Sequence, residues 1–212
     1  MLVDSEPIRF RAGALALAEI GVSLTWERFL TDWLGRTDEA GLAHILGERY
    51  QAEAKRVVTR RNVLYEERLD EVSPFADAVR LLGRLHNGIR LAVATGSRRT
   101  EVEQILTRLG LSQRFHALVT AEDYRHAKPA PEPFLTAARR MDLAPASCLV
   151  VEDSPAGVLA AQAAGMPVLG VNRGRVATGL RQATWTVTSL DAVTVTAEGD
   201  IIVNSATGRG QA

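Results

Sequence analysis

The sequence predicts an α/β protein in which a block of helices precedes a parallel β-sheet. Three apolar runs alternate with segments of helical periodicity, at residues 89–94, 148–151 and 167–171, and Arg90 is the one interruption of the first. Strands that alternate with helices are typical of a parallel sheet, and strands without polar alternation are expected to be covered on both faces. No strand pattern precedes residue 88, so residues 9–72 are expected to form an all-helical block.

The helical block follows from local signals. Residues 5–20 fit an amphipathic helix, in which Pro7 is tolerated in the first turn and Gly21 is a typical terminator. Residues 24–68 continue the helical pattern, because their apolar residues recur every three or four positions.

From residue 74 on, helices and strands alternate. Their periodicity and their Pro and Gly boundaries predict helices at 74–86, 100–109, 131–141 and 157–165. Strands are expected at 89–94, 117–120, 148–151 and 167–171. A terminal strand or hairpin is expected over 185–195 and 201–203, because the Glu198-Gly199-Asp200 turn separates two apolar stretches.

Composition excludes several classes of protein. Lys plus Arg and Asp plus Glu are 25 each, so a formal net charge of zero argues against nucleic-acid binding. No apolar stretch approaches the ~18 residues of a membrane span, and the acidic N-terminus is unlike a signal peptide. The single cysteine, Cys148, excludes an internal disulfide and is read as a buried small hydrophobe. We therefore expect a cytoplasmic protein without membrane contact.

Three predicted strand ends carry polar groups, where ligands of open parallel sheets bind. Thr95-Gly96-Ser97 offers hydroxyl and backbone N–H donors before a helix, which suits a phosphate, although an ordinary helix cap explains the same residues. Lys128 lies in the stiff segment His126-Ala-Lys-Pro-Ala-Pro131, where its ammonium could neutralise a phosphate, or could simply be exposed.

The third strand end carries the adjacent carboxylates of Glu152 and Asp153. Two acids at the end of an apolar strand are costly unless a cation compensates them, and Mg²⁺ prefers such oxygen ligands. The alternative is a helix N-cap formed by Asp153 or Ser154, which would not explain the acidity of Glu152. None of the four histidines is placed to act on phosphorus: His44, His86, His116 and His126.

The order of these motifs resembles the haloacid dehalogenase superfamily of phosphohydrolases, in its β-phosphoglucomutase-like and sugar-phosphatase branch. The segments that carry the resemblance are LVDSEP (2–7), LAVATGS (91–97), HAKPAPEPF (126–134) and VVEDSPAGVLAAQAAGM (150–166). The resemblance implies a Rossmann-like core formed by residues 1–8 and 73–212, with a helical cap, residues 9–72, inserted after the first strand.

The resemblance also implies roles for individual residues. Thr95 and Lys128 would be catalytic-site residues, and together with Gly96 and Ser97 they would bind phosphate. Asp153, with Glu152 beside it, would hold Mg²⁺. The substrate would be a small phosphorylated metabolite such as a sugar phosphate, contacted from the cap by Arg36, and the protein would be a monomer or weak dimer.

The departure from the family pattern is large. The family's motif reads DxDGxLVDSEP, and its first aspartate is the nucleophile, whereas this sequence begins with Met1 in place of the x before LVDSEP. Asp4 is not a substitute, because its family counterpart lies past the loop. The first core strand is therefore expected to be missing, which would leave a groove between two strands with unpaired backbone groups. We expect the 212-residue chain as written to be inactive and poorly folded.

Within the family, the sequence favours a phosphatase over a phosphomutase. Asp38 falls at about the position where the mutase has an arginine for a second phosphate. Dehalogenation is disfavoured, since halide displacement does not need a metal-type acid pair. A phosphomutase, and a non-catalytic remnant that keeps the phosphate pocket, stay open as alternatives.

Overall fold

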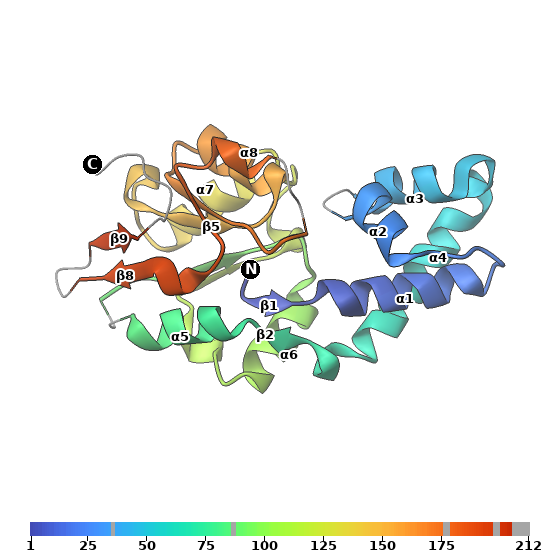
Figure 1. Cartoon of the computed structure of the whole chain (residues 1–212), viewed down its shortest axis with the longest axis horizontal. Coiled ribbons are helices and arrows are strands. Elements are labelled where there is room, and N and C mark those ends of the chain that lie inside the picture. Colours follow the sequence, from blue (N-terminus) through green and yellow to red (C-terminus); the bar gives the residue numbers. More distant parts are fainter. Residues whose placement is uncertain (35–36, 86–87, 176–178, 197–199, 205–212) are drawn as a thin grey trace. The chain divides into compact units, whose positions relative to one another are not determined.

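The computed structural model describes residues 1–212 except 35–36, 86–87, 176–178, 197–199 and 205–212. The chain divides into two compact units (Figure 1). One consists of Met1–Leu2 and Pro74–Ala212 and the other of Val3–Ser73. None of the helices in the described residues is both long and apolar enough to cross a membrane.

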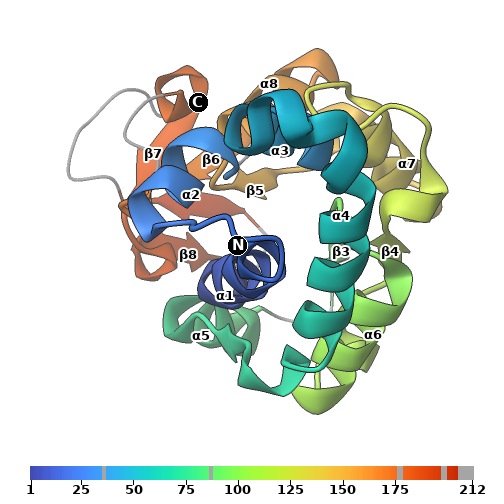
Figure 2. The same cartoon turned by 90° about the vertical axis from the view of Figure 1, so that its right-hand side faces the viewer.

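The Val3–Ser73 unit is built from helices. They are α1 (Glu6–Ala18), α2 (Trp26–Asp32), α3 (Asp38–Leu46) and α4 (Tyr50–Glu66), with 3-10 turns η1 (Gly47–Arg49) and η2 (Leu69–Glu71). Figure 2 shows α1 and α4 side by side, and α1 and α4 are in extensive contact. The expected single helical run from 24 to 68 is interrupted, because Thr37 begins a new helix by accepting a hydrogen bond from Ala40 N at 3.2 Å, and Gly47 adopts φ +53°.

Trp33 organises the packing of this helical unit. Its indole Nε1 donates to Asp38 Oδ1 at 3.0 Å, and Phe29 packs at 6.2 Å between ring centroids. A Cβ added to Gly41 would lie 2.5 Å from Trp33 Cδ1, so the indole occupies space that only a glycine leaves free. The Asp38 carboxylate also pairs with Arg61.

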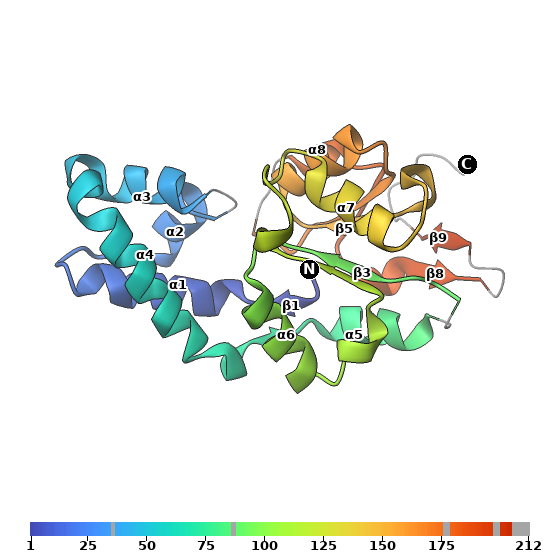
Figure 3. The same ribbon diagram turned by 180° about the vertical axis from the view of Figure 1, so that it is seen from behind.

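The other unit is α/β, with strands and helices in the alternating order that the sequence predicts. Its helices are α5 (Ala76–Arg84), α6 (Arg99–Arg108), α7 (Glu132–Arg140) and α8 (Pro155–Ala163), and its short turns are η3 (Ser112–Arg114), η4 (Ala121–Asp123), η5 (Pro145–Ser147), η6 (Leu180–Gln182) and η7 (Leu190–Ala192). Its strands are β3 (Ala92–Ala94), β4 (Ala117–Val119), β5 (Val150–Glu152), β6 (Val168–Val171), β7 (Trp185–Val187), β8 (Val193–Val195) and β9 (Ile201–Val203). Figure 3 shows α7 and α8 on one side of the parallel strands and α5 and α6 on the other.

The strands form separate sheets within the described residues. β3 pairs in parallel with β4, in the register Val93 to Leu118, and β5, β6 and β7 form a second parallel sheet in that order. β8 and β9 are the expected terminal hairpin, while β7 joins the parallel sheet instead. Two further short strands, β1 (Val3–Asp4) and β2 (Ser73–Pro74), form a two-stranded sheet, so the helix expected to open at Pro74 begins at Ala76.

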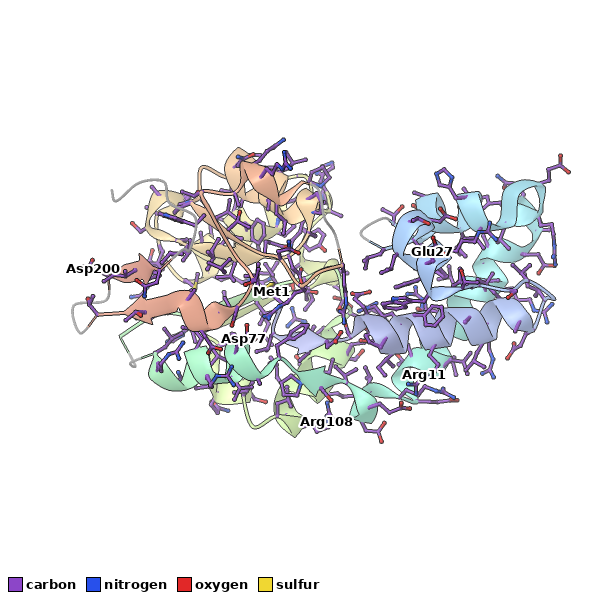
Figure 4. All side chains as sticks on the ribbon, in the orientation of Figure 1. Met1, Arg11, Glu27, Asp77, Arg108 and Asp200 are labelled. Carbon is purple, nitrogen blue, oxygen red and sulfur yellow. The ribbon has the colours of Figure 1, made fainter. Side chains whose placement is uncertain are left out.

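The hydrophobic core lies on both faces of β6. Val168 packs with α7 and α8, whereas Leu169 and Val171 pack with α5 and the chain around Leu190. All three side chains are fully buried. Alternation of side chains across a strand explains the two faces, and helices on both sides explain why the run contains no polar residue. Met1, labelled in Figure 4, is partly buried against the second of these clusters.

Candidate functional site

The candidate site lies at the carboxyl ends of β3 and β5 in the α/β unit. Thr95 directly follows β3, Glu152 is the last residue of β5, and Lys128 lies between η4 and α7. Parallel strands place such ends at one edge of the unit, where polar groups meet without interrupting the apolar strands. The side chain of Lys128 contacts both strand ends.

Lys128 is held by two acceptors and an aromatic ring. Its Nζ donates to Ala94 O at 3.1 Å and forms an ion pair with Glu152 Oε1. The same ammonium lies 4.6 Å from the centroid of the Phe134 ring, which is a favourable cation–π distance. The lysine side chain is 19% exposed, so it is neither the freely exposed loop lysine of the alternative interpretation nor completely buried.

Glu152 is the anchor for this lysine. Its second oxygen, Oε2, accepts from Ser154 N at 3.1 Å and Ser154 Oγ at 2.9 Å, and also from Asp153 N at 3.1 Å. Burial alone would raise the pKa of the Glu152 carboxyl, but the Lys128 ammonium and the Ser154 donors outweigh burial and lower it. Glu152 is therefore ionised at neutral pH, and both of its oxygens are engaged by the protein.

The backbone around Gly157 makes room for Glu152. A Cβ added to Gly157 would lie 2.0 Å from Glu152 Cδ and 2.3 Å from both carboxylate oxygens. Gly157 N donates to Ser154 Oγ at 3.1 Å, so Ser154 is the N-cap of α8. Capping thus uses Ser154 and leaves Asp153 for another role. The Asp153 side chain is 33% exposed, and its Oδ2 lies 3.3 Å from the Met1 ammonium.

The Thr95-Gly96-Ser97 segment forms a tight turn before α6. Ser97 N donates to Thr95 Oγ1 at 3.2 Å, so the hydroxyl accepts one bond, and a hydroxyl in this state can still donate its own hydrogen. The ordinary helix-cap interpretation does not describe this turn, since α6 has Arg98 at its N-cap without a side-chain cap bond. Instead the Glu122 carboxylate accepts from Arg99 N at 3.1 and 3.2 Å.

The histidines that the structure describes have ordinary environments. His116 Nδ1 accepts from Leu91 N at 3.2 Å, and exposed His126 pairs with Glu132 at 2.9 Å. His44 lies in the last turn of α3. His86 and the predicted substrate contact Arg36 lie outside the described residues.

The donors at the site fit Mg²⁺ as part of a coordination shell. Among the described residues no group of three or more His, Cys, Asp or Glu side chains is placed to hold a metal ion. Mg²⁺ is commonly held by one or two carboxylates together with waters and substrate phosphate. Asp153 offers such a carboxylate in place of its partly exposed ion pair with the Met1 ammonium, whereas both oxygens of Glu152 are engaged by Lys128, Ser154 and the Asp153 N–H.

Sequence reasoning missed two residues that shape this site. Tyr124 OH donates to Thr95 O at 3.1 Å, although a tyrosine after an acidic turn carries no recognisable signal. The sequence pattern places Gly157 only at the start of a small-residue helix. A glycine inside a helix, three residues after its cap, is a signal for close packing that could have identified it.

This arrangement is that of an α/β protein with polar side chains gathered at the carboxyl ends of its parallel strands. Comparison with known proteins identifies the family, because a family model for haloacid dehalogenase-like hydrolases matches residues 7–165. The chain belongs to this family and is a phosphohydrolase.

Several relatives are phosphatases of small phosphorylated compounds. The chain is 32% identical to fructose-1-phosphate phosphatase YqaB of Escherichia coli, over 80% of this chain and 90% of that protein. It is 31% identical to hexitol phosphatase A of the same organism, over 95% and 94% of the two chains. It is 35% identical to β-phosphoglucomutase of Bacillus subtilis, over 58% of this chain and 56% of the mutase.

Solved structures show the same fold. A putative phosphoglycolate phosphatase from Lactobacillus plantarum superposes with a TM-score of 0.81 at 20% identity, covering 89% of this chain and 90% of that chain. A β-phosphoglucomutase from Clostridium difficile gives 0.76 at 24% identity, covering 90% of this chain and 87% of that chain. These likenesses establish the architecture, a Rossmann-like α/β fold with helices.

Proposed function

We propose that the α/β unit binds the phosphate group of a small sugar or sugar-alcohol phosphate and serves its Mg²⁺-dependent hydrolysis. The observation that carries this proposal is the placement of Lys128, whose Nζ contacts both Ala94 O and the buried Glu152 carboxylate. A fixed ammonium beside a hydroxyl-bearing turn is suited to hold a dianionic phosphate and to neutralise charge that develops on it.

Each residue has a distinct role in this proposal. The Thr95 hydroxyl and the Gly96 N–H donate to phosphate oxygens, and Ser97, whose N–H is bonded to Thr95 Oγ1, completes the turn around the anion. Lys128 supplies positive charge, and Glu152 holds Lys128 in place. Asp153 is the carboxylate for Mg²⁺, which would add further neutralisation of phosphate charge when bound.

These residues bind and orient phosphate, but none of them is a nucleophile for phosphorus. The family's Asp-x-Asp-Gly motif has no counterpart in the 212 residues. We infer that these residues alone do not hydrolyse the substrate, and that hydrolysis requires a strand that bears this motif. The separation of β3 from β5 supports the inference, because a parallel strand between them would join the two sheets and place its end beside Lys128.

A phosphatase is preferred to a phosphomutase. Asp38 in the helical unit stands at about the position where a mutase has an arginine for the second phosphate. Its carboxylate accepts from Trp33 and pairs with Arg61, and a negative charge at this position would repel a second phosphate. Among the relatives compared by sequence, the two Escherichia coli phosphatases match over 90% and 94% of their lengths, whereas the Bacillus subtilis mutase matches over 56%.

The test compares two proteins: the 212-residue chain, and the same chain extended by an apolar strand that ends in Asp-x-Asp-Gly. Both are assayed with Mg²⁺ for phosphate release from p-nitrophenyl phosphate, fructose 1-phosphate and hexitol phosphates. We expect release only from the extended chain. Activity of the shorter chain would overturn the account of the nucleophile. A folded but inactive extended chain would favour the non-catalytic binding module, and isomerisation without release would favour the mutase.

A further inference from the structure

Besides the ion pair between Arg99 and Asp123, four hydrogen-bonded contacts attach the Thr95 turn and the start of α6 to the last residue of β4 and the segment that follows it. Three involve backbone N–H groups: Thr95 N donates to Val119 O at 2.9 Å, Ala121 N to Ser97 O at 3.1 Å, and Arg99 N to the Glu122 carboxylate. The fourth is different, because the phenolic hydroxyl of Tyr124 donates to the carbonyl oxygen of Thr95 at 3.1 Å.

Tyr124 lies directly against the turn that carries the proposed phosphate donors. A Cβ on Gly96 would lie 3.7 Å from the Tyr124 hydroxyl, which is ordinary van der Waals contact. Thr95 bonds the protein through three polar groups. Its carbonyl accepts from Tyr124, its N–H donates to Val119 O, and its hydroxyl oxygen accepts from the Ser97 N–H, which leaves the hydroxyl hydrogen as the remaining donor. That remaining hydrogen is the one that a phosphate oxygen would accept.

The segment that carries Tyr124 is itself firmly held. The Asp123 carboxylate accepts from Thr120 N at 2.8 Å and Thr120 Oγ1 at 2.9 Å. It also pairs with Arg99 and Arg140, each at 2.6 Å. Because Asp123 is the neighbour of Tyr124, this network fixes the backbone from which the tyrosine ring extends. The Tyr124 hydroxyl therefore donates to Thr95 O from a segment that is held by its own network of bonds.

We propose that Tyr124 is a positioning residue for phosphate binding, which orients the Thr95 hydroxyl and the Gly96 amide through the Thr95 carbonyl, while the Ser97 N–H stays bonded to Thr95 Oγ1. This inference rests on the proposed phosphate site. Hydrogen-bond donors that are already aimed at a ligand bind it without the cost of being ordered, so the loss of one such restraint weakens binding more than it weakens the fold.

The test uses Tyr124→Phe, which removes only the phenolic hydroxyl, with Tyr50→Phe in the helical unit as the matched control. The dissociation constant of inorganic phosphate is measured by calorimetry, and amide hydrogen exchange at Gly96 and Ser97 is measured by NMR. Tyr124→Phe is expected to weaken phosphate binding about tenfold. It should also accelerate exchange at both amides while the urea midpoint changes little. Tyr50→Phe should match the wild type in all three measurements.

The outcomes separate this role from the function on which it depends. Unchanged affinity and unchanged exchange in Tyr124→Phe, beside a wild type that binds phosphate, would overturn the role of Tyr124 and leave the proposed function standing. A wild type that binds no phosphate would overturn both. Equal losses of affinity and of global stability would mean that the hydroxyl is a structural contact only.

Discussion

The Lys128 ammonium and the Glu152 carboxylate form an ion pair in which both side chains are largely buried, at 19% and 8% exposure. Burying two charges is costly, and their mutual attraction offsets that cost only when the remaining donors and acceptors are also satisfied. Ser154 and Ala94 provide those contacts on the acid and the lysine respectively. The pair is therefore a fixed electrostatic element, and most of the predictions below test parts of it.

Replacing Lys128 with methionine should destabilise the fold and abolish phosphate binding. The substitution leaves the buried Glu152 carboxylate without its cation, and breaking a buried pair in this way costs about 3–5 kcal/mol. Unfolding in urea measures the free energy, and calorimetry with inorganic phosphate measures binding.

A double variant separates the structural and binding roles of this lysine. Lys128→Met with Glu152→Gln removes both charges, while the amide oxygen introduced at position 152 retains an acceptor for Ser154, so much of the lost stability should return. Phosphate binding should not return, because the ammonium is absent. Recovery of phosphate affinity in the double variant would contradict the proposed role of Lys128.

The pH dependence of stability should reveal the ionised state of Glu152. Its pKa in the folded protein is lowered from the ordinary 4.5. The contribution of the carboxylate is therefore fully present above the unfolded pKa, and is lost as pH falls through the folded one. Urea midpoints from pH 7 to 3 should show the difference between wild type and Glu152→Gln constant down to about pH 5, then shrinking as pH falls. A difference that grows below pH 4 would contradict this sign.

Comparison with Glu152→Gln is needed because other acids with lowered pKa values titrate in the same pH range. Burial tends to raise the pKa of Asp77, but the hydrogen bonds from Arg173 and Leu190 N lower it overall. Its contribution to stability is therefore lost in the same acidic range. Subtracting the variant's curve from that of the wild type removes this shared term.

The sequence allows much of the α/β unit to be predicted, because its signals are local. The apolar run that becomes β6 contains no polar residue since both of its faces are covered, and Gly110 and Gly165 end helices with positive φ, at +66° and +70°. Boundaries were less accurate. The run at 89–94 yields only the strand Ala92–Ala94, because apolar composition alone does not say where ladder pairing begins.

The positions of the site residues followed from motif order, but their contacts did not. Glu152 and Asp153 look equivalent in sequence, yet one carboxylate turns toward Lys128 and Ser154 while the other is one-third exposed. The different environments of the two acids depend on Gly157, which lacks a side chain where the Glu152 carboxylate lies, and on Lys128, which is 24 residues away in sequence. The contact of Tyr124 with Thr95 could not be predicted either, because it depends on the parallel pairing of β4 with β3.

Gly157→Ala should be destabilising although alanine is normally the better helix residue. The new Cβ would lie 2.0 Å from Glu152 Cδ, so the carboxylate must move and its contacts with Lys128 must change. We expect a loss of about 1–3 kcal/mol in urea unfolding, together with weaker phosphate binding. Gly83→Ala in α5 is the matched control, since nothing lies within 4 Å of its added Cβ. It should stabilise the protein by about 0.5–1 kcal/mol, and equal effects of the two substitutions would contradict this account.

Asp153→Asn should remove the effect of Mg²⁺ without weakening the fold. Ser154 supplies the cap of α8, and the change removes only the partly exposed ion pair between Asp153 and the Met1 ammonium, so it should alter the free energy of unfolding by less than about 1 kcal/mol. In the wild type, Mg²⁺ should strengthen the binding of inorganic phosphate, because the metal and the anion neutralise each other beside Asp153. Calorimetric titration with and without Mg²⁺ measures this coupling, with Asp142→Asn, in the turn after α7, as the control for removing an acid elsewhere. Persistence of the full Mg²⁺ effect in Asp153→Asn would show that the metal is held by other groups, since an amide oxygen without charge is a much weaker ligand for a hard cation.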